Sequence, residues 1–122
     1  MIDFPDARTA ARQLAAVGEP TRLLILYRLT QGPHHVGELA DLLGVPIVNM
    51  SHHLGVLRHF GLVEDVKRGR RVVYQFNPEL FTPVKGDGEV IGTLSLGVCR
   101  LDIRKSGGPS ADGAPAAKKP KK

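Results

Sequence analysis

Hydrophobic residues recur at helical spacing along the first third of the chain. Apolar positions three and four residues apart predict an amphipathic helix over residues 4–17. A second, densely apolar segment opens at Pro20 and closes before Gly32, and it is predicted to be the central buried helix. A third, shorter helix ends at Gly44. Its expected inward positions are Val36, Leu39, Leu42 and Leu43.

A fourth helix follows almost at once. Pro46 suits the first turn of this helix, and Gly61 follows its end. Met50, Leu54 and Leu57 share one face at i, i+4, i+7 spacing and predict its buried stripe. Two short helices joined by a tight connection at Gly44 indicate a helix-turn-helix.

After Gly61 the apolar pattern changes from helical to alternating. Residues 62–66 and 72–76 are rich in β-branched and aromatic side chains, and they flank Gly69. This arrangement predicts a β-hairpin with its turn at Gly69. The expected fold is therefore mainly α with a β-hairpin wing (α+β), a winged helix-turn-helix.

Length and composition limit the class of protein. The 122 residues are enough for one modest hydrophobic core. A lone cysteine, Cys99, excludes an internal disulfide and indicates a reducing compartment. The longest apolar run, residues 23–27, is far shorter than a membrane span, and the first residues lack the pattern of an export signal. A cytoplasmic protein without a membrane partner is expected.

The net charge of +5 is unevenly distributed. Five of the 17 basic residues, but one of the 12 acidic residues, lie from Lys105 onward, so the body is nearly neutral. Residues 1–104 are expected to form the domain, and residues 105–122 a disordered Lys-rich tail without core-forming side chains. Within the body, "KRGRR" places Lys67, Arg68, Arg70 and Arg71 at the predicted hairpin tip.

Residues 14–77 resemble the ArsR/SmtB family of bacterial winged-helix repressors. The resemblance rests on "GEPTRLLIL" in the second helix, "SHHLGVLRHFGLV" in the fourth and "RGRRVVYQFN" across the hairpin. It covers about half of the chain. It implies a homodimer that binds double-stranded operator DNA, an imperfect palindrome, and releases it when an effector is sensed.

Three histidines of the fourth helix raise the question of a metal centre. His52 and His59 share a face but are separated by about 10.5 Å of helical rise, and His53 is about 100° from His52 around the axis. No two of them have the i, i+3 or i, i+4 spacing from which a helix chelates an ion. His53 is expected to be a hydrogen-bonded core histidine, and no metal is expected in this stretch.

The outward face of the fourth helix carries small and polar groups near its start, as a recognition helix requires. The resemblance assigns DNA reading to a set of residues here: Ile47, Val48, Asn49, Ser51 and His52. Ile47 and Val48 stand where the family commonly has polar side chains, so they either meet thymine methyl groups or pack on a neighbouring element. Arg58 borders this face, and the hairpin cations are expected to follow phosphates or enter the minor groove.

The usual metal sites of the family are not matched. Metal-sensing relatives often carry two cysteines at the positions of His35 and Gly37, and a second family site uses histidines of a C-terminal helix, whereas no histidine follows His59. A site built from His34, His35 and Cys99 remains an alternative. No cofactor is expected.

Residues 88–103 also depart from the family, because they alternate instead of forming a last helix. A change of phase at Gly97 predicts a bulge or turn between extra strands that pack on the body or across the dimer. Cys99 is either a small buried residue or a redox-active thiol.

Three classes of function remain at this stage. The first is a dimeric ArsR-type repressor that lacks the usual metal sites. The second is a DNA-binding protein that is effector-independent, thiol-responsive or regulated by a protein docking on the C-terminal strands. An enzyme is not expected, since no phosphate-binding loop, acid pair or activated nucleophile has usable spacing.

Overall fold

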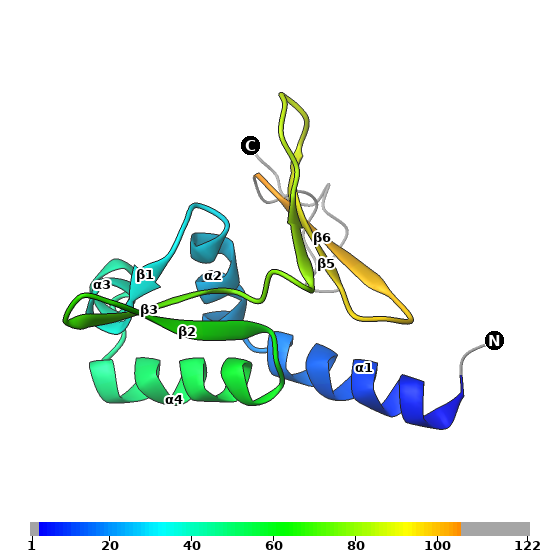
Figure 1. Ribbon diagram of the computed structural model, residues 1–122, viewed down its shortest axis with the longest axis horizontal. Helices are drawn as coiled ribbons and strands as arrows, with labels where there is room; N and C mark the ends of the chain where they lie inside the picture. Colours follow the sequence, from blue (N-terminus) through cyan, green and yellow to red (C-terminus); the bar gives the residue numbers. More distant parts are fainter. Residues whose placement is uncertain (1–2, 106–122) are drawn as a thin grey trace, which may run out of the picture.

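The computed structural model describes residues 3–105, which form four helices and two small antiparallel sheets (Figure 1). The helices are α1 (Phe4–Val17), α2 (Pro20–Leu29), α3 (Val36–Leu43) and α4 (Ile47–His59). The strands are β1 (His34–His35), β2 (Val63–Arg68), β3 (Arg71–Phe76), β4 (Phe81–Pro83), β5 (Val90–Ser95) and β6 (Arg100–Arg104). The α+β winged helix-turn-helix expected from the sequence is confirmed. The predicted tail lies outside the described residues, apart from Lys105.

The helix boundaries follow from local capping. At the start of α1 the Asp3 carboxylate accepts a hydrogen bond from the Asp6 amide. At the start of α2 the Glu19 carboxylate accepts one from the Arg22 amide. A capping box between His35 and Glu38 opens α3. Gly44 ends α3 in the left-handed region, with φ of 64°, where a side chain would be strained.

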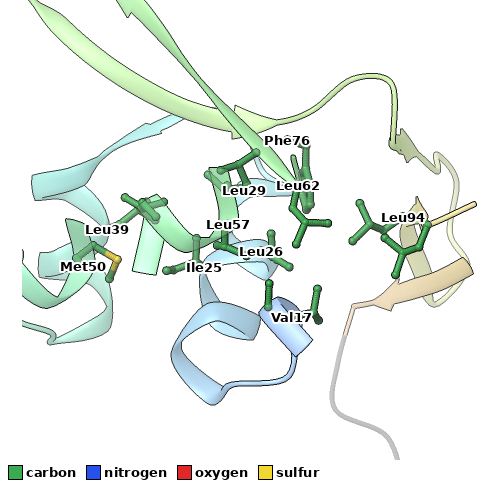
Figure 2. Packing of buried hydrophobic residues seen from close by; sticks show 14 of the residues in the cluster. Val17, Ile25, Leu26, Leu29, Leu39, Met50, Leu57, Leu62, Phe76 and Leu94 are labelled. Atoms are coloured by element: carbon green, nitrogen blue, oxygen red, sulfur yellow. The ribbon is translucent and has the colours of Figure 1, made fainter. Parts of the chain in front are cut away.

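One hydrophobic core joins the helices to the wing. Met50, Leu54 and Leu57 of α4 are fully buried, as predicted, and they pack with Ile25 of α2 and Leu39 of α3 in one cluster. Figure 2 shows this cluster extending to Leu62 and Phe76 of the wing and on to Leu94 of β5. The C-terminal strands therefore share the core of the helical domain.

Two expectations about inward faces were wrong. Leu42 is 45% exposed, because α3 turns Leu39 and Ala40 toward the core instead. The second helix is buried on one face only: Leu23 and Leu24 are about half exposed. A dense apolar run does not reveal which side of a helix the body covers.

The wing is a three-stranded sheet in the order β1-β3-β2. In β2 and β3, Arg68 pairs with Arg71, so the turn consists of Gly69 and Arg70 alone. Gly69 has φ of 63° and Arg70 does not enter the positive region, as in a type II′ hairpin turn. Both wing strands are longer than predicted. The edge strand β1 pairs His34 with Tyr74 and was not foreseen.

The second sheet has the order β4-β5-β6 and lies at the opposite end of the molecule from the hairpin tip (Figure 1). The phase change at Gly97 is a turn, with φ of 84°, between β5 and β6, as expected. Val98 and Cys99 lie in this turn and not in a continuing strand. The short strand β4 was not predicted, and β5 has an irregularity between Val90 and Gly92.

Gly92 permits an aromatic stack that joins the two sheets. The rings of Phe76 and Phe81 stack with centroids 4.0 Å apart and planes 6° apart. A Cβ at Gly92 would overlap Cε1 and Cζ of the Phe81 ring, so this ring would have to shift against Phe76, on which it is stacked. We expect Gly92→Ala to lower the free energy of unfolding by about 1–3 kcal/mol, as overpacked cores do. Urea denaturation measures this loss.

The matched control is Gly88→Ala, since nothing lies within 4 Å of a Cβ at Gly88. This control should be neutral or stabilising by about 0.4–1 kcal/mol, because alanine restricts the unfolded chain. Equal unfolding free energies for the two variants would contradict the role assigned to Gly92.

Candidate nucleic-acid interface

The first half of α4 presents an uncovered face. Ile47 is 52% exposed and Val48 is 77% exposed, so no element among the described residues covers them. Of the two alternatives for these residues, packing on a neighbouring element therefore finds no support within one chain. Asn49, Ser51 and His52 are exposed beside them. All five sequence-predicted reading positions thus lie together on the free side of α4.

Gly55 continues this face toward the end of the helix. A Cβ at Gly55 would meet nothing within 4 Å, so the glycine leaves a smooth patch on α4. His59 is exposed at the last turn, with its ring edge-on to Phe60 at a centroid distance of 4.8 Å. A glycine at this point allows another backbone to approach the helix closely.

The wing and α4 run to the same end of the molecule. Arg58 of α4 pairs with Asp65 of β2, with 3.6 Å between Nη1 and Oδ2, and the two side chains are 55% and 39% exposed. From Asp65 the strand continues to the hairpin tip, and in Figure 1 this tip lies at the end where α4 begins. The exposed tip cations are Lys67, Arg68, Arg70 and Arg71. Four cations and the open helix face therefore occupy one end of the fold.

Arg22 connects three elements behind this face. Its Nε donates to the carbonyl oxygen of Ala16 in α1, and its Nη1 lies 3.2 Å from Nδ1 of His53 in α4. Its backbone amide donates to the Glu19 carboxylate at 2.8 Å. Because a guanidinium can only donate, Nδ1 of His53 is the acceptor in this contact. The expectation of a hydrogen-bonded His53 is confirmed, although the side chain is 16% exposed.

Electrostatics at this junction favour an ionised Glu19. The backbone amide of Arg22 lowers the pKa of the Glu19 carboxyl below its ordinary value, against a smaller opposing effect of burial. The Glu19 Oε1 also lies 3.8 Å from Nδ1 of His53. Glu19 and Arg22, which were not predicted from the sequence as functional residues, thus hold α4 against α1 and α2. The signal was present in "EPTR", which the resemblance included without assigning a role.

The side chains of the two histidines before α3 contact backbone groups. Nδ1 of His35 accepts from the Glu38 amide at 3.3 Å, and Nδ1 of His34 lies 2.8 Å from the Gly32 carbonyl oxygen. Within residues 3–105 no three His, Cys, Asp or Glu side chains are grouped as metal ligands would be. In the same part of the chain, no helix has the length and apolarity needed to cross a bilayer.

Comparison with known proteins defines the class first: a winged helix-turn-helix transcriptional regulator, and not an enzyme. Residues 19–65 match the model of the family described as "Bacterial regulatory protein, arsR family". The regulator Rv2034 of Mycobacterium tuberculosis is 38% identical over 89 residues, which cover 73% of this chain and 83% of Rv2034. The chain belongs to the ArsR family.

Two further proteins are similar to part of this chain. The regulator NmtR of Mycobacterium tuberculosis is 41% identical over 73 residues, 60% of this chain and 61% of NmtR. The match thus spans about three fifths of that relative. The solution structure of a homodimeric winged helix-turn-helix DNA-binding domain of Mb0332 from Mycobacterium bovis is 33% identical, with a TM-score of 0.57, over 60% of this chain and 68% of that one.

Proposed function

We propose that this protein is a homodimeric repressor that binds operator DNA through α4 and the wing. One observation carries the proposal: the uncovered first half of α4 and the four wing-tip cations lie at the same end of the molecule. An exposed helix face with short polar side chains suits the major groove, where base edges are distinguishable. A cationic hairpin beside it suits the phosphate backbone or a narrow minor groove.

Each residue has a role in this pose. Asn49, Ser51 and His52 contact base edges, and the exposed Ile47 and Val48 meet thymine methyl groups. Arg58 and the wing cations, Lys67, Arg68, Arg70 and Arg71, contact phosphates, which fixes the register of the protein on the duplex. Arg22 holds His53, and with it α4, at a defined rotation against α1 and α2.

The first helix supports the dimer. Phe4, Ala7, Ala11 and Leu14 follow one line along α1; Ala11 is exposed, Phe4 is 78% exposed and Leu14 is 39% exposed. The relative Mb0332 is homodimeric by its own description. A two-fold dimer carries two recognition helices, so the operator should be an imperfect palindrome with half-sites about 34 Å apart.

The direct test is selection of bound duplexes from a random pool, followed by fluorescence anisotropy on the selected and a scrambled sequence. We expect a palindromic selected site that is preferred by at least about 10³-fold over the scrambled duplex at physiological salt. Equal affinity for both duplexes would contradict sequence-specific recognition. Repeating the titration with metals or with an oxidant separates an effector-regulated repressor from an effector-independent or Cys99-dependent one.

Metals should have little effect on operator binding. Zn(II), Cd(II) and As(III) are each expected to change the affinity by less than about tenfold, or 1.4 kcal/mol. Nδ1 of His35 is engaged in the capping box, and Gly37 offers no ligand where the family often has cysteine. Anisotropy with and without each metal checks this. A larger release of DNA that His35→Ala or Cys99→Ser abolishes would contradict it.

The wing cations should act through phosphates. Replacing Arg70 and Arg71 with alanine is expected to lower the slope of log K against log salt by about 0.9 per lost contact. The loss of affinity should be similar on selected and scrambled duplexes, since phosphates carry no sequence information. The matched control replaces two exposed cations away from the wing, Lys85 between β4 and β5 and Arg104 of β6, which removes the same charge. An unchanged slope in the wing variant would exclude these contacts.

A further inference from the structure

A cavity of about 200 Å³ lies between α2 and the C-terminal sheet. Its walls come from three parts of the chain: the end of α1, one face of α2, and the inner face of the β5-β6 hairpin. The apolar side chains that line it are Val17, Leu23, Leu26, Leu94, Leu101 and Ile103. In Figure 2, Val17 and Leu26 lie on one side of this region and Leu94 on the other.

The polar groups near the cavity form hydrogen bonds with other parts of the chain. The hydroxyl of Tyr27, at the edge of the cavity, donates to the carbonyl oxygen of Lys105 at 3.0 Å. Asp102 also borders the cavity, but its carboxylate accepts from the hydroxyl of Thr93 at 3.2 Å on the other, exposed face of the sheet. A bound molecule would therefore meet apolar side chains and no free charge among these groups.

We propose that this cavity binds a small, neutral, apolar molecule, aromatic or branched aliphatic, as the effector of the protein. An apolar cavity of about 150 Å³ in another protein stays dry and takes up benzene, so 200 Å³ accommodates a molecule slightly larger than benzene. A helix or strand of a partner is about 10 Å across with its side chains and does not fit this volume. The size and the lining together select the ligand class.

The position of the cavity explains how such a ligand acts on DNA. Val17 ends α1, and Leu23 and Leu26 belong to α2, the helix that holds α4 through Arg22 and His53. A ligand between α2 and β6 changes the packing of both against α1. This regulatory step rests on the proposed function, whereas binding of the ligand does not. By linkage, a ligand that weakens operator binding must itself bind more weakly to the DNA complex.

Two adjacent leucines provide a matched pair of variants. Leu23 lines the cavity at its open side and is 52% exposed, whereas Leu24 is 51% exposed and does not line it. Leu23→Trp places a large side chain in the cavity mouth, and Leu24→Trp adds the same group beside it. Both positions are half exposed, so both variants should fold, as circular dichroism and amide NMR spectra will show.

The experiment titrates the full-length, DNA-free protein with indole and with benzoate, a charged molecule of similar size. Amide NMR should show saturable shifts at Tyr27, Leu94 and Leu101 with indole and none with benzoate. Leu23→Trp should weaken indole binding by at least about tenfold, and Leu24→Trp by less than about twofold. Absence of saturable shifts, equal binding of benzoate, or equal loss in both variants would overturn the site.

Anisotropy on the selected duplex then tests regulation separately. Indole at saturation should weaken operator binding of the wild type by about 5–150-fold and leave Leu23→Trp unaffected. Indole binding without any change in operator affinity would overturn the effector role while the site stands. Failure of the protein to bind any duplex would instead contradict the proposed function, and the NMR titration would still decide the site.

Discussion

Replacing Leu14 with glutamate is expected to dissociate the dimer at micromolar concentration and to weaken operator binding by about 10²- to 10⁴-fold. Leu14 belongs to the apolar line of α1, together with Phe4 and Ala11, and all three are exposed. A two-fold interface uses the same patch of both copies, so the substitution would place two carboxylates in the apolar contact and desolvate them. A monomer engages one half-site and loses the gain from linked binding. Light scattering and anisotropy measure the two effects.

Ala15→Glu is the matched control for this prediction. Ala15 is exposed on the same turn of α1 and lies about 100° around the helix from Leu14. It should leave both the dimer and operator binding nearly unchanged. A Leu14→Glu protein that stays dimeric, or a monomer that binds the palindrome with full affinity, would show that α1 is not the dimer contact.

The winged helix-turn-helix could be predicted because its signals are local. Helical spacing fixed α1 to the residue, and buried Met50, Leu54 and Leu57 set the orientation of α4. The hairpin followed from two β-rich arms around Gly69. Each of these signals lies within one element and repeats with the period of that element.

The missed features depend on contacts between distant parts of the chain. Strand β1 exists because His34 and His35 pair with β3, about 40 residues later, and two residues carry no periodicity of their own. Leu42 matches the apolar pattern of α3, but the body covers the neighbouring face. The cavity arises where β5 and β6 return to α2, so no stretch of sequence contains it.

The candidate site also has a part that could be predicted from the sequence and a part that could not. The reading positions of α4 could be named because an outward face follows from the buried stripe of the same helix. The residue that holds α4 in place could not be predicted. Arg22 contacts Ala16 in α1 and His53 in α4, and a sequence does not show which arginine makes such contacts. Local pattern thus predicted the exposed face of α4, and tertiary structure was needed to show which residues hold this helix in place.

Sequence discrimination should depend on the first half of α4. Ser51→Ala and His52→Ala are each expected to reduce the preference for the selected duplex over the scrambled one by about 1–3 kcal/mol, the value of a good base contact. Both side chains are exposed, and neither has a hydrogen bond to the described chain, so stability should change little. Anisotropy on both duplexes at several salt concentrations gives the preference and the salt slope.

His59→Ala is the matched control for the two reading variants. His59 is exposed on the same face as His52 but about 10.5 Å further along α4, beyond the part that enters the groove in the proposed pose. Its removal should change the affinity for both duplexes by a similar, small factor. Because a lost phosphate contact weakens binding to every sequence and a lost base contact does not, the two duplexes separate these roles. If Ser51→Ala and His52→Ala weakened binding to both duplexes equally, while the Arg70 and Arg71 replacements erased the preference, sequence reading would belong to the wing.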